Sequence, residues 1–150
     1  MKRAFASLAL VIQGACVEAF VPEVGPLLVS PCENADSDPA RDVSLARDLI
    51  AGVFVRGSNT CLDCHSTDGA TPIGLAVGGL DLSSHQTLLR GGARGGTDTV
   101  VVGEPCASVL IQKINDAPPF GGQMPLEGPP LAITDRQLIS DWIVEGARDN

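Results

Sequence analysis

The sequence predicts an all-α fold, on two observations. Leu45, Leu49 and Val53 recur at a spacing of four residues, which places them on one face of a helix. A second apolar stripe lies near the other end of the chain and is formed by Leu138, Ile139, Trp142 and Ile143. Residues 100–102 could form a short strand, but a single strand does not make a sheet. We therefore expect a domain of helices and loops.

Four helices are expected, and their ends carry recognisable signals. They cover residues 43–56, 83–90, 105–115 and 134–148. Asp42 or Ser44 could cap the first helix, because short polar side chains accept hydrogen bonds from free backbone N–H groups. Gly57 and Gly91 could end the first two helices, and Pro105 suits the first turn of the third.

The fourth helix has the clearest predicted start. Thr134 and Gln137 have the spacing of a capping box, in which the two side chains satisfy early backbone N–H groups. Asp135 near the start and Arg148 near the end both match the helix dipole. These signals predict the two ends of the helix that carries the second apolar stripe.

Composition and charge narrow the classes of function. Hydrophobic residues make up 44% and charged residues 19% of the 150 positions, as in a globular chain of one domain with short extras. Aromatic residues make up only 3%, which is thin for such a core, so a bulky apolar cofactor could supply the missing volume. The net charge of −8 would repel a phosphate backbone, which argues against general nucleic-acid binding. No apolar run is long enough to span a bilayer.

Residues 1–19 are predicted to be a secretory signal peptide. Lys2 and Arg3 directly precede an unbroken apolar run, which favours export over a short core helix. Two cleavage sites compete. Cleavage before Cys16 would leave a cysteine able to carry a lipid anchor, as in bacterial lipoproteins, and cleavage after Ala19 would discard it. The mature protein would be periplasmic or otherwise extracytoplasmic, and a lipid would anchor it to a membrane.

Residues 20–42 are predicted to be an acidic, proline-rich tether, and residues 43–150 the folded domain. Proline fixes φ and interrupts helices, and acidic side chains favour solvent. The residues concerned are Pro22, Pro26, Pro31 and Pro39, with Glu33, Asp36, Asp38 and Asp42.

The chemistry of the sequence is concentrated in Cys61, Cys64 and His65. Two cysteines three residues apart, followed at once by histidine, match the attachment motif of c-type haem. On a helical turn, side chains at i and i+3 point the same way, so both thiols can form thioethers with the two vinyl groups on one edge of a porphyrin. His65 would then offer an imidazole nitrogen to the iron as proximal ligand. We expect one covalently bound haem c.

Three other interpretations of this motif are weaker. A thioredoxin-like pair of thiols needs a βαβ context, which the predicted elements do not provide. A structural zinc site needs two paired sets of ligands, whereas Cys32, His85 and Cys106 stand singly in the sequence. A disulfide within the motif would leave its histidine unexplained.

Met124 is the predicted ligand on the other face of the haem. It is followed by Pro125 and lies in a loop with Gly121 and Gly122, where glycine allows close approach to the ring. This loop is too polar to be a core element. His85 is the second candidate, but it lies in a short predicted helix beside polar residues, where a solvated or locally hydrogen-bonded side chain is expected.

A set of short motifs follows in order between about residues 49 and 147. They are the haem motif at 61–65, Gly79-Leu80-Asp81-Leu82, Arg90-Gly91-Gly92, Val102-Gly103-Glu104-Pro105 with Ser108 and Leu110, Met124-Pro125, Trp142-Ile143 and Gly146-Ala147. This ordered set resembles the small class I c-type cytochromes, and most closely the planctomycete-type cytochrome c domain. The resemblance implies a compact helical fold around one haem, ligation by His65 and Met124, and electron transfer. The chain departs from the family's usual pattern at Leu126, where a second proline is common.

Cys32 and Cys106 remain once the haem motif is assigned and Cys16 is lipidated or removed. In an oxidising compartment these two could form a disulfide, which would close a loop of about 75 residues. The alternative is two unpaired, buried thiols.

Electron transfer is the first functional hypothesis. With both axial positions filled by protein, the iron has no open place for a substrate, and no catalytic set of side chains stands out, so we expect an electron carrier and not an enzyme. The alternative is a haem-based sensor or small-ligand-binding protein from which Met124 dissociates, and a haem-free zinc or thiol module is a third hypothesis. We expect a monomer. From the acidic balance we also expect that its redox partners present basic surfaces.

Overall fold

Helices and loops build the whole of the described chain, which comprises residues 32–57, 60–116 and 118–150 of a computed structural model. In chain order the helices are η1 (Leu45–Val53), α1 (Cys61–Cys64), α2 (Ile73–Gly78), α3 (His85–Arg90), η2 (Gly96–Thr99), η3 (Pro105–Ala107), α4 (Val109–Ile114) and α5 (Ile133–Val144). The all-α prediction is confirmed. Residues 100–102 form no strand: Val100 has extended backbone (φ −133°, ψ 108°), but within the described ranges no second strand lies beside it.

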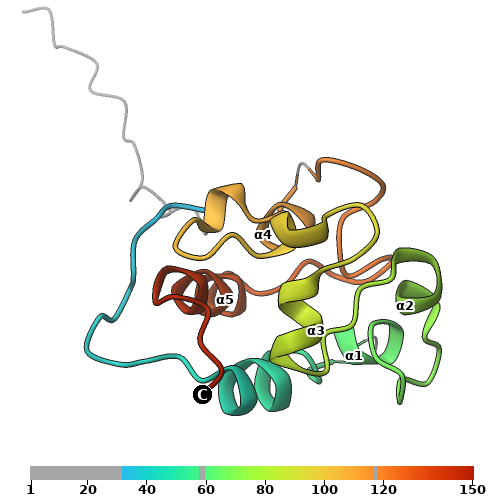
Figure 1. Cartoon of the computed structure of the whole chain (residues 1–150), viewed down its shortest axis with the longest axis horizontal. Helices are drawn as coiled ribbons and strands as arrows, with labels where there is room; N and C mark the ends of the chain where they lie inside the picture. The colour runs from blue at the N-terminus through green and yellow to red at the C-terminus, as the bar shows by residue number, and fades with distance from the viewer. Residues whose placement is uncertain (1–31, 58–59, 117) are drawn as a thin grey trace, which may run out of the picture.

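The last helix, α5, lies at the centre of the fold. It contacts η1, η3 and α4, and Figure 1 shows it between η1 and α4. Ile139, Trp142 and Ile143 on α5 are fully buried, as the predicted apolar stripe requires, and Leu138 is partly buried. The other buried apolar residues are Val43, Leu45, Leu49, Val53, Phe54, Leu82, Leu88, Val100, Leu110, Ile111, Ile114 and Ala147. Most of the core is therefore aliphatic.

The first helix, η1, buries the face that its sequence predicts. Leu45, Leu49 and Val53 are all buried. Ser44 is its cap, since the Ser44 hydroxyl accepts a hydrogen bond from the Arg47 N–H at 3.2 Å. This helix is a π-helix, which is wound more widely than an α-helix because its hydrogen bonds run from i to i−5. One example is the bond from the Phe54 N–H to the Leu49 carbonyl at 2.7 Å.

The predicted capping box at the start of α5 is wrong. The helix begins two residues earlier than a box capped by Thr134 requires, at Ile133, and its cap residue is Ala132, whose side chain has no acceptor. Thr134 therefore lies inside the first turn, and Gln137 donates forward to Asp141 at 2.7 Å instead of back to the cap. The predicted end also differs, because the helix stops at Val144, before Arg148 is reached.

The third predicted helix is two helices. Ser108 has extended backbone (φ −75°, ψ 122°) between η3 and α4. Its hydroxyl, fully buried, accepts from the Val101 N–H at 2.9 Å and donates to the Glu104 carbonyl at 3.0 Å. These bonds compete with helix continuation, as serine side chains do. The second predicted helix is confirmed from His85, with Ser84 as its cap and Gly91 after its end.

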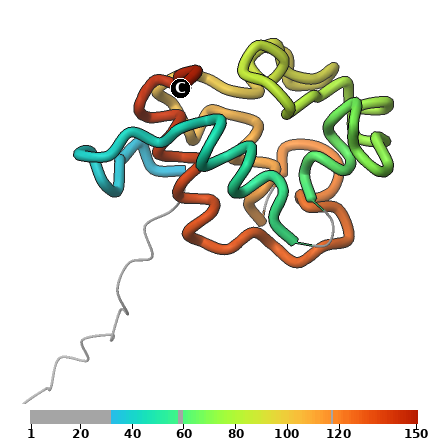
Figure 2. The backbone as a smooth tube through the Cα atoms, turned by 90° about the horizontal axis from the view of Figure 1, so that it is seen from below, coloured from blue at the N-terminus to red at the C-terminus, as the bar shows by residue number. Residues whose placement is uncertain are grey.

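The described part of the predicted tether lies along α5. The Ser37 N–H and hydroxyl both donate to the Asp141 carboxylate, and the Val43 N–H donates to Glu145 at 2.6 Å. Figure 2 shows this blue segment beside the red end of the chain. The predicted signal peptide with Cys16 and the earlier part of the tether lie outside the described residues, and the domain boundaries stay a prediction. None of the helices described here has the length and hydropathy of a membrane span.

Candidate haem-attachment site

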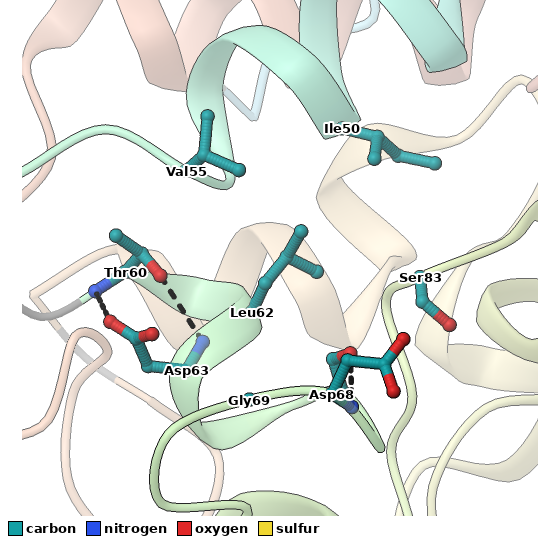
Figure 3. Close-up of a pocket in the computed structure, with 9 residues that line it drawn as sticks. Ile50, Val55, Thr60, Leu62, Asp63, Asp68, Gly69 and Ser83 are labelled. Atoms are coloured by element: carbon teal, nitrogen blue, oxygen red, sulfur yellow. Dashed lines mark hydrogen bonds between the residues drawn. The ribbon is translucent and has the colours of Figure 1, made fainter.

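The two cysteines of the motif lie on one capped helical turn. The Thr60 hydroxyl accepts from the Asp63 N–H at 3.1 Å, and the Asp63 carboxylate accepts from the Thr60 N–H at 3.1 Å (Figure 3). A helix as short as α1 does not form alone, because its nucleation costs more than its few backbone bonds return. The reciprocal cap offsets part of that cost. It thereby holds Cys61 and Cys64 at i and i+3, on the same face of α1.

His65 ends this turn with its ring fixed by the chain that follows. Its Nδ1 lies 3.1 Å from the Leu80 carbonyl oxygen, and its own carbonyl accepts from the Leu82 N–H at 2.8 Å. A carbonyl only accepts hydrogen bonds, so Nδ1 carries the ring proton and Nε2 keeps a free lone pair. Histidines that ligate metals are commonly held in this way by a backbone carbonyl on the other ring nitrogen.

Burial favours the neutral forms of the His65 imidazole and the Cys61 thiol. Burial lowers the pKa of His65 below its usual 6.5, and the Lys113 ammonium lowers it further, against the raising effect of the Leu80 bond. The imidazole is thus unprotonated near neutral pH, as a metal ligand must be. Burial raises the pKa of Cys61 to about 11. A thiol of that pKa is a poor partner for thiol–disulfide exchange, which needs the thiolate.

The backbone of α2 comes close to the His65 ring. A Cβ atom at Gly74 would lie 2.6 Å from His65 Cε1 and 2.7 Å from Nε2, which no side chain could tolerate. The His65 ring can lie this close to α2 only because residue 74 has no side chain. The donor set present, two thiols on one turn and a neutral imidazole whose Nε2 has no hydrogen-bond partner among the described residues, is the chemistry that a covalently attached haem requires.

One motif of the family resemblance forms the support beneath His65. Gly79 ends α2 in the left-handed conformation (φ 66°), which favours glycine and turns the chain back. Leu80 then presents its carbonyl to the His65 ring. Asp81, only 8% exposed, accepts from the Ser83 N–H at 2.9 Å and from its hydroxyl at 2.6 Å, which fixes the exit of the turn.

Met124 lies near the same apolar cluster as the motif. It is half-buried and packs against the core, as do Cys61 and Leu62. Its N–H donates to the Lys113 carbonyl at 2.7 Å, which ties its loop to α4. Its assignment as the second axial ligand stays a prediction.

His85 has a structural partner. Its Nε2 lies 2.7 Å from the Ala147 carbonyl oxygen, so that nitrogen is the donor, and its ring meets the edge of Trp142 at a centroid distance of 6.4 Å. The side chain is hydrogen-bonded, but to a carbonyl 62 residues away in the chain and not to its polar neighbours in sequence. This contact fastens α3 to the turn after α5.

A groove lies on another side of α1. Its cavity volume is about 440 Å³, and it is lined by Ile50, Val55, Thr60, Leu62, Asp63, Ser66, Asp68, Gly69 and Ser83. Figure 3 shows Leu62 pointing into it toward the end of η1. The lining includes the two residues between the motif cysteines but neither cysteine and not His65. The groove is therefore distinct from the attachment face.

Cys32 and Cys106, the pair for which a disulfide is predicted, have side chains within hydrogen-bond distance of each other. The pKa of Cys106 is raised to about 11, chiefly by burial and then by a side-chain hydrogen bond with Cys32. Cys32 itself packs against the core. The disulfide between them stays a prediction.

Three contributors to the site were missed from the sequence. The Thr60–Asp63 cap had a readable signal, a threonine followed three residues later by an acid. The Leu80 carbonyl had none, because every residue carries a carbonyl. Lys113 had none either, since its role depends on which loop lies beside α4.

Comparison with known proteins adds one match. Residues 61–128 match the model of a protein family described as Planctomycete cytochrome C. No curated protein and no solved structure matches the chain. Within the described ranges, no group of three or more His, Cys, Asp or Glu side chains could hold a metal ion.

Proposed function

We propose that the protein is an exported electron carrier with one covalent haem c. The premise is the match of residues 61–128 to the planctomycete cytochrome c family, which marks a c-type cytochrome domain in that part of the chain. The observation that carries the proposal is the arrangement of Cys61, Cys64 and His65. Both thiols lie on one capped turn, and the bond from His65 Nδ1 to the Leu80 carbonyl leaves Nε2 for the iron.

In this proposal Cys61 and Cys64 attach the haem, His65 is the proximal ligand and Met124 is the distal ligand. When bound, the haem supplies a one-electron couple between ferrous and ferric iron. The protein's part is to hold the ligands and exclude water. His65 is held by Leu80 and kept neutral by burial, and Met124 is held by its bond to α4.

Filled axial positions favour a carrier over a ligand-binding protein. A carrier needs no open coordination site, because the electron passes at the haem edge. The competing sensor function needs Met124 to leave readily. The family is typically one of electron carriers and is usually extracytoplasmic, which agrees with export under the predicted signal peptide. A lipid at Cys16 and redox partners with basic surfaces belong to the same proposal.

The first experiment asks whether haem is covalently bound. Protein exported to the periplasm is analysed by denaturing electrophoresis with haem staining and by intact mass. We expect stained protein with the mass of one haem added. Haem that extracts into acidic solvent, or a mass without haem, would refute the attachment.

The second experiment compares Met124→Ala with His85→Ala in haem-loaded protein. Loss of the thioether should lower the reduction potential, because a thioether stabilises ferrous over ferric iron. It should also abolish the near-infrared charge-transfer band of the ferric protein and allow carbon monoxide to bind the ferrous protein. His85→Ala should leave all three unchanged, since His85 is engaged with the Ala147 carbonyl. Wild-type protein that binds carbon monoxide readily would favour the sensor.

A further inference from the structure

The end of α4 holds the Met124 loop through one residue. The Lys113 carbonyl accepts from the Met124 N–H at 2.7 Å. The Lys113 ammonium donates to the Phe120 carbonyl at 2.7 Å and to the Gly122 carbonyl. Backbone and side chain of one lysine thus bind both ends of residues 120–124.

This loop has little other support. Residues 118–132 contain no helix or strand, and one backbone hydrogen bond joins two of them, from the Gly128 N–H to the Pro125 carbonyl at 3.2 Å, outside residues 120–124. Besides the Lys113 bonds, Gln123 makes two long contacts, at 3.4 Å to the Ile114 carbonyl and 3.3 Å to Asp116. Hydrogen bonds from an ammonium are stronger than those between neutral groups. Lys113 is therefore the main anchor of the loop.

The surroundings hold the lysine in place. Its Nζ lies 5.1 Å from the centroid of the Phe120 ring, and the Arg94 guanidinium approaches the same ring at 5.6 Å. The ammonium is partly buried, and its pKa is lowered by that burial and by Arg94. Its positive charge also contributes to the lowered pKa of His65. Lys113 thus holds the loop of one proposed axial ligand and acts electrostatically on the other.

We propose that Lys113 is a positioning residue that keeps Met124 on the haem iron by clamping residues 120–124 to α4. The proposal rests on the proposed function, in which Met124 is the distal ligand. The clamp sets how often Met124 leaves, and so how well an external ligand can compete. A tight clamp makes the protein a carrier, and a loosened clamp would make it a binder of small ligands.

The test measures binding of imidazole to the ferric, haem-loaded protein. An external ligand binds only the state from which Met124 has left, so its apparent affinity rises in proportion to that population. In Lys113→Leu the loop loses both ammonium bonds. We expect imidazole to bind at least about tenfold more tightly, since the loss of even one of the two charge-assisted hydrogen bonds corresponds to about that factor in an equilibrium constant. The near-infrared band should weaken in the same variant.

Arg94→Leu is the matched control. It removes the other cation from the Phe120 ring, but Arg94 donates no hydrogen bond to the described residues of the loop. Its imidazole affinity should stay within about twofold of the wild type. An equal gain in Arg94→Leu would show that charge, and not the clamp, is responsible, and would overturn the inference. Lys113→Gln, which can still donate to one carbonyl, should lie between Lys113→Leu and wild type.

The outcomes separate the inference from the proposed function. A wild-type protein with the near-infrared band, and a Lys113→Leu protein with unchanged imidazole affinity, would refute the clamp and leave Met124 ligation intact. A wild-type protein without the band would refute Met124 ligation and the clamp with it. Circular dichroism checks that each variant keeps its helices, and if Lys113→Leu fails this check, the same comparison is decided on Lys113→Gln.

Discussion

Gly74 is the residue on which the shape of the proposed haem site depends most directly. A Cβ at this position would lie 2.6 Å from the His65 ring, while a Cβ at Gly78 in the same helix would meet nothing within 4 Å. Gly74→Ala should therefore cost about 1–3 kcal/mol of unfolding free energy, because overpacking forces the ring or α2 to move. Gly78→Ala should be neutral or stabilise by up to about 1 kcal/mol.

Denaturant unfolding of the haem-loaded protein, followed with the absorption spectrum, measures both Gly74→Ala and Gly78→Ala. The spectrum should change only in Gly74→Ala, since only there should the ring of His65, the proposed proximal ligand, shift. Equal stability of the two variants would contradict the close approach of α2 to His65.

The sequence singles out Cys61, Cys64 and His65 as candidates because their chemistry lies in side-chain type and spacing, and their haem-binding roles stay a prediction. Among the groups that support them, the Thr60–Asp63 cap had a readable signal and the others had none. Leu80 acts through its backbone carbonyl, which every residue has, and Gly74 acts through its lack of a side chain, which the other glycines of the chain share. Their roles appear only when the fold brings two distant segments together.

At the scale of elements, η1 is held at its start by a charged network around Asp48. This carboxylate accepts from the Ser44 N–H at 2.9 Å and from Arg47 at 2.6 Å, and Arg41 lies 3.2 Å away. The Arg47 hydrogen bond is the main cause that lowers the pKa of Asp48 to about 2 from its usual 3.8. A pKa lowered by folding means that the charged form stabilises the fold.

The stabilisation by Asp48 should depend on pH with a defined sign. It is fully present above the unfolded pKa of 3.8 and is lost as pH falls toward about 2. The difference in unfolding free energy between wild type and Asp48→Asn should therefore shrink over that window. In Arg47→Gln the stabilisation by Asp48 should be lost at a higher pH than in the wild type, because the guanidinium no longer lowers the pKa of the carboxylate. A difference that does not vary with pH would contradict the network.

Helices could be predicted better than their ends. The apolar stripes of η1 and α5 are long and periodic, and both lie where the sequence places them. The Thr134 box fails because tertiary contacts select the start of α5: Arg56 pairs with Asp135, and Gln137 is drawn to Asp141. The break at Ser108 likewise comes from a buried hydroxyl that binds Val101, a contact no local pattern reveals.

At the scale of the whole molecule, a bond between Cys32 and Cys106 would join the start of the described chain to the segment between η2 and α4. The expected disulfide would close a loop of about 75 residues and constrain the unfolded chain by ~4 kcal/mol. Peptide mapping of exported protein without reduction should find the two peptides linked. Reductant should then lower the stability of the wild type to that of Cys106→Ser and leave the variant unchanged. Free thiols at both positions would rule the bond out.

Charge also acts at the scale of the whole molecule, where the net value is −8. Acidic groups gather at one end, where Asp36, Asp42 and Asp141 add to the burial that raises the pKa of Glu145. Figure 1 shows this end, with the cyan segment, across the molecule from α1 and α2. A cationic partner would therefore be attracted by the molecule as a whole, and opposite charge mainly raises the rate of association.

The rate of electron exchange with a cationic cytochrome should fall steeply as ionic strength rises. Salt screens the attraction, with a Debye length of ~8 Å at physiological ionic strength. Stopped-flow mixing of the reduced protein with the oxidised partner over a series of salt concentrations measures the dependence. An uncharged small oxidant is the control, and its rate should stay flat because it feels no net force. If the cationic partner also gave a flat or rising dependence, partners with basic surfaces would be excluded, since the long-range attraction that defines them would be missing.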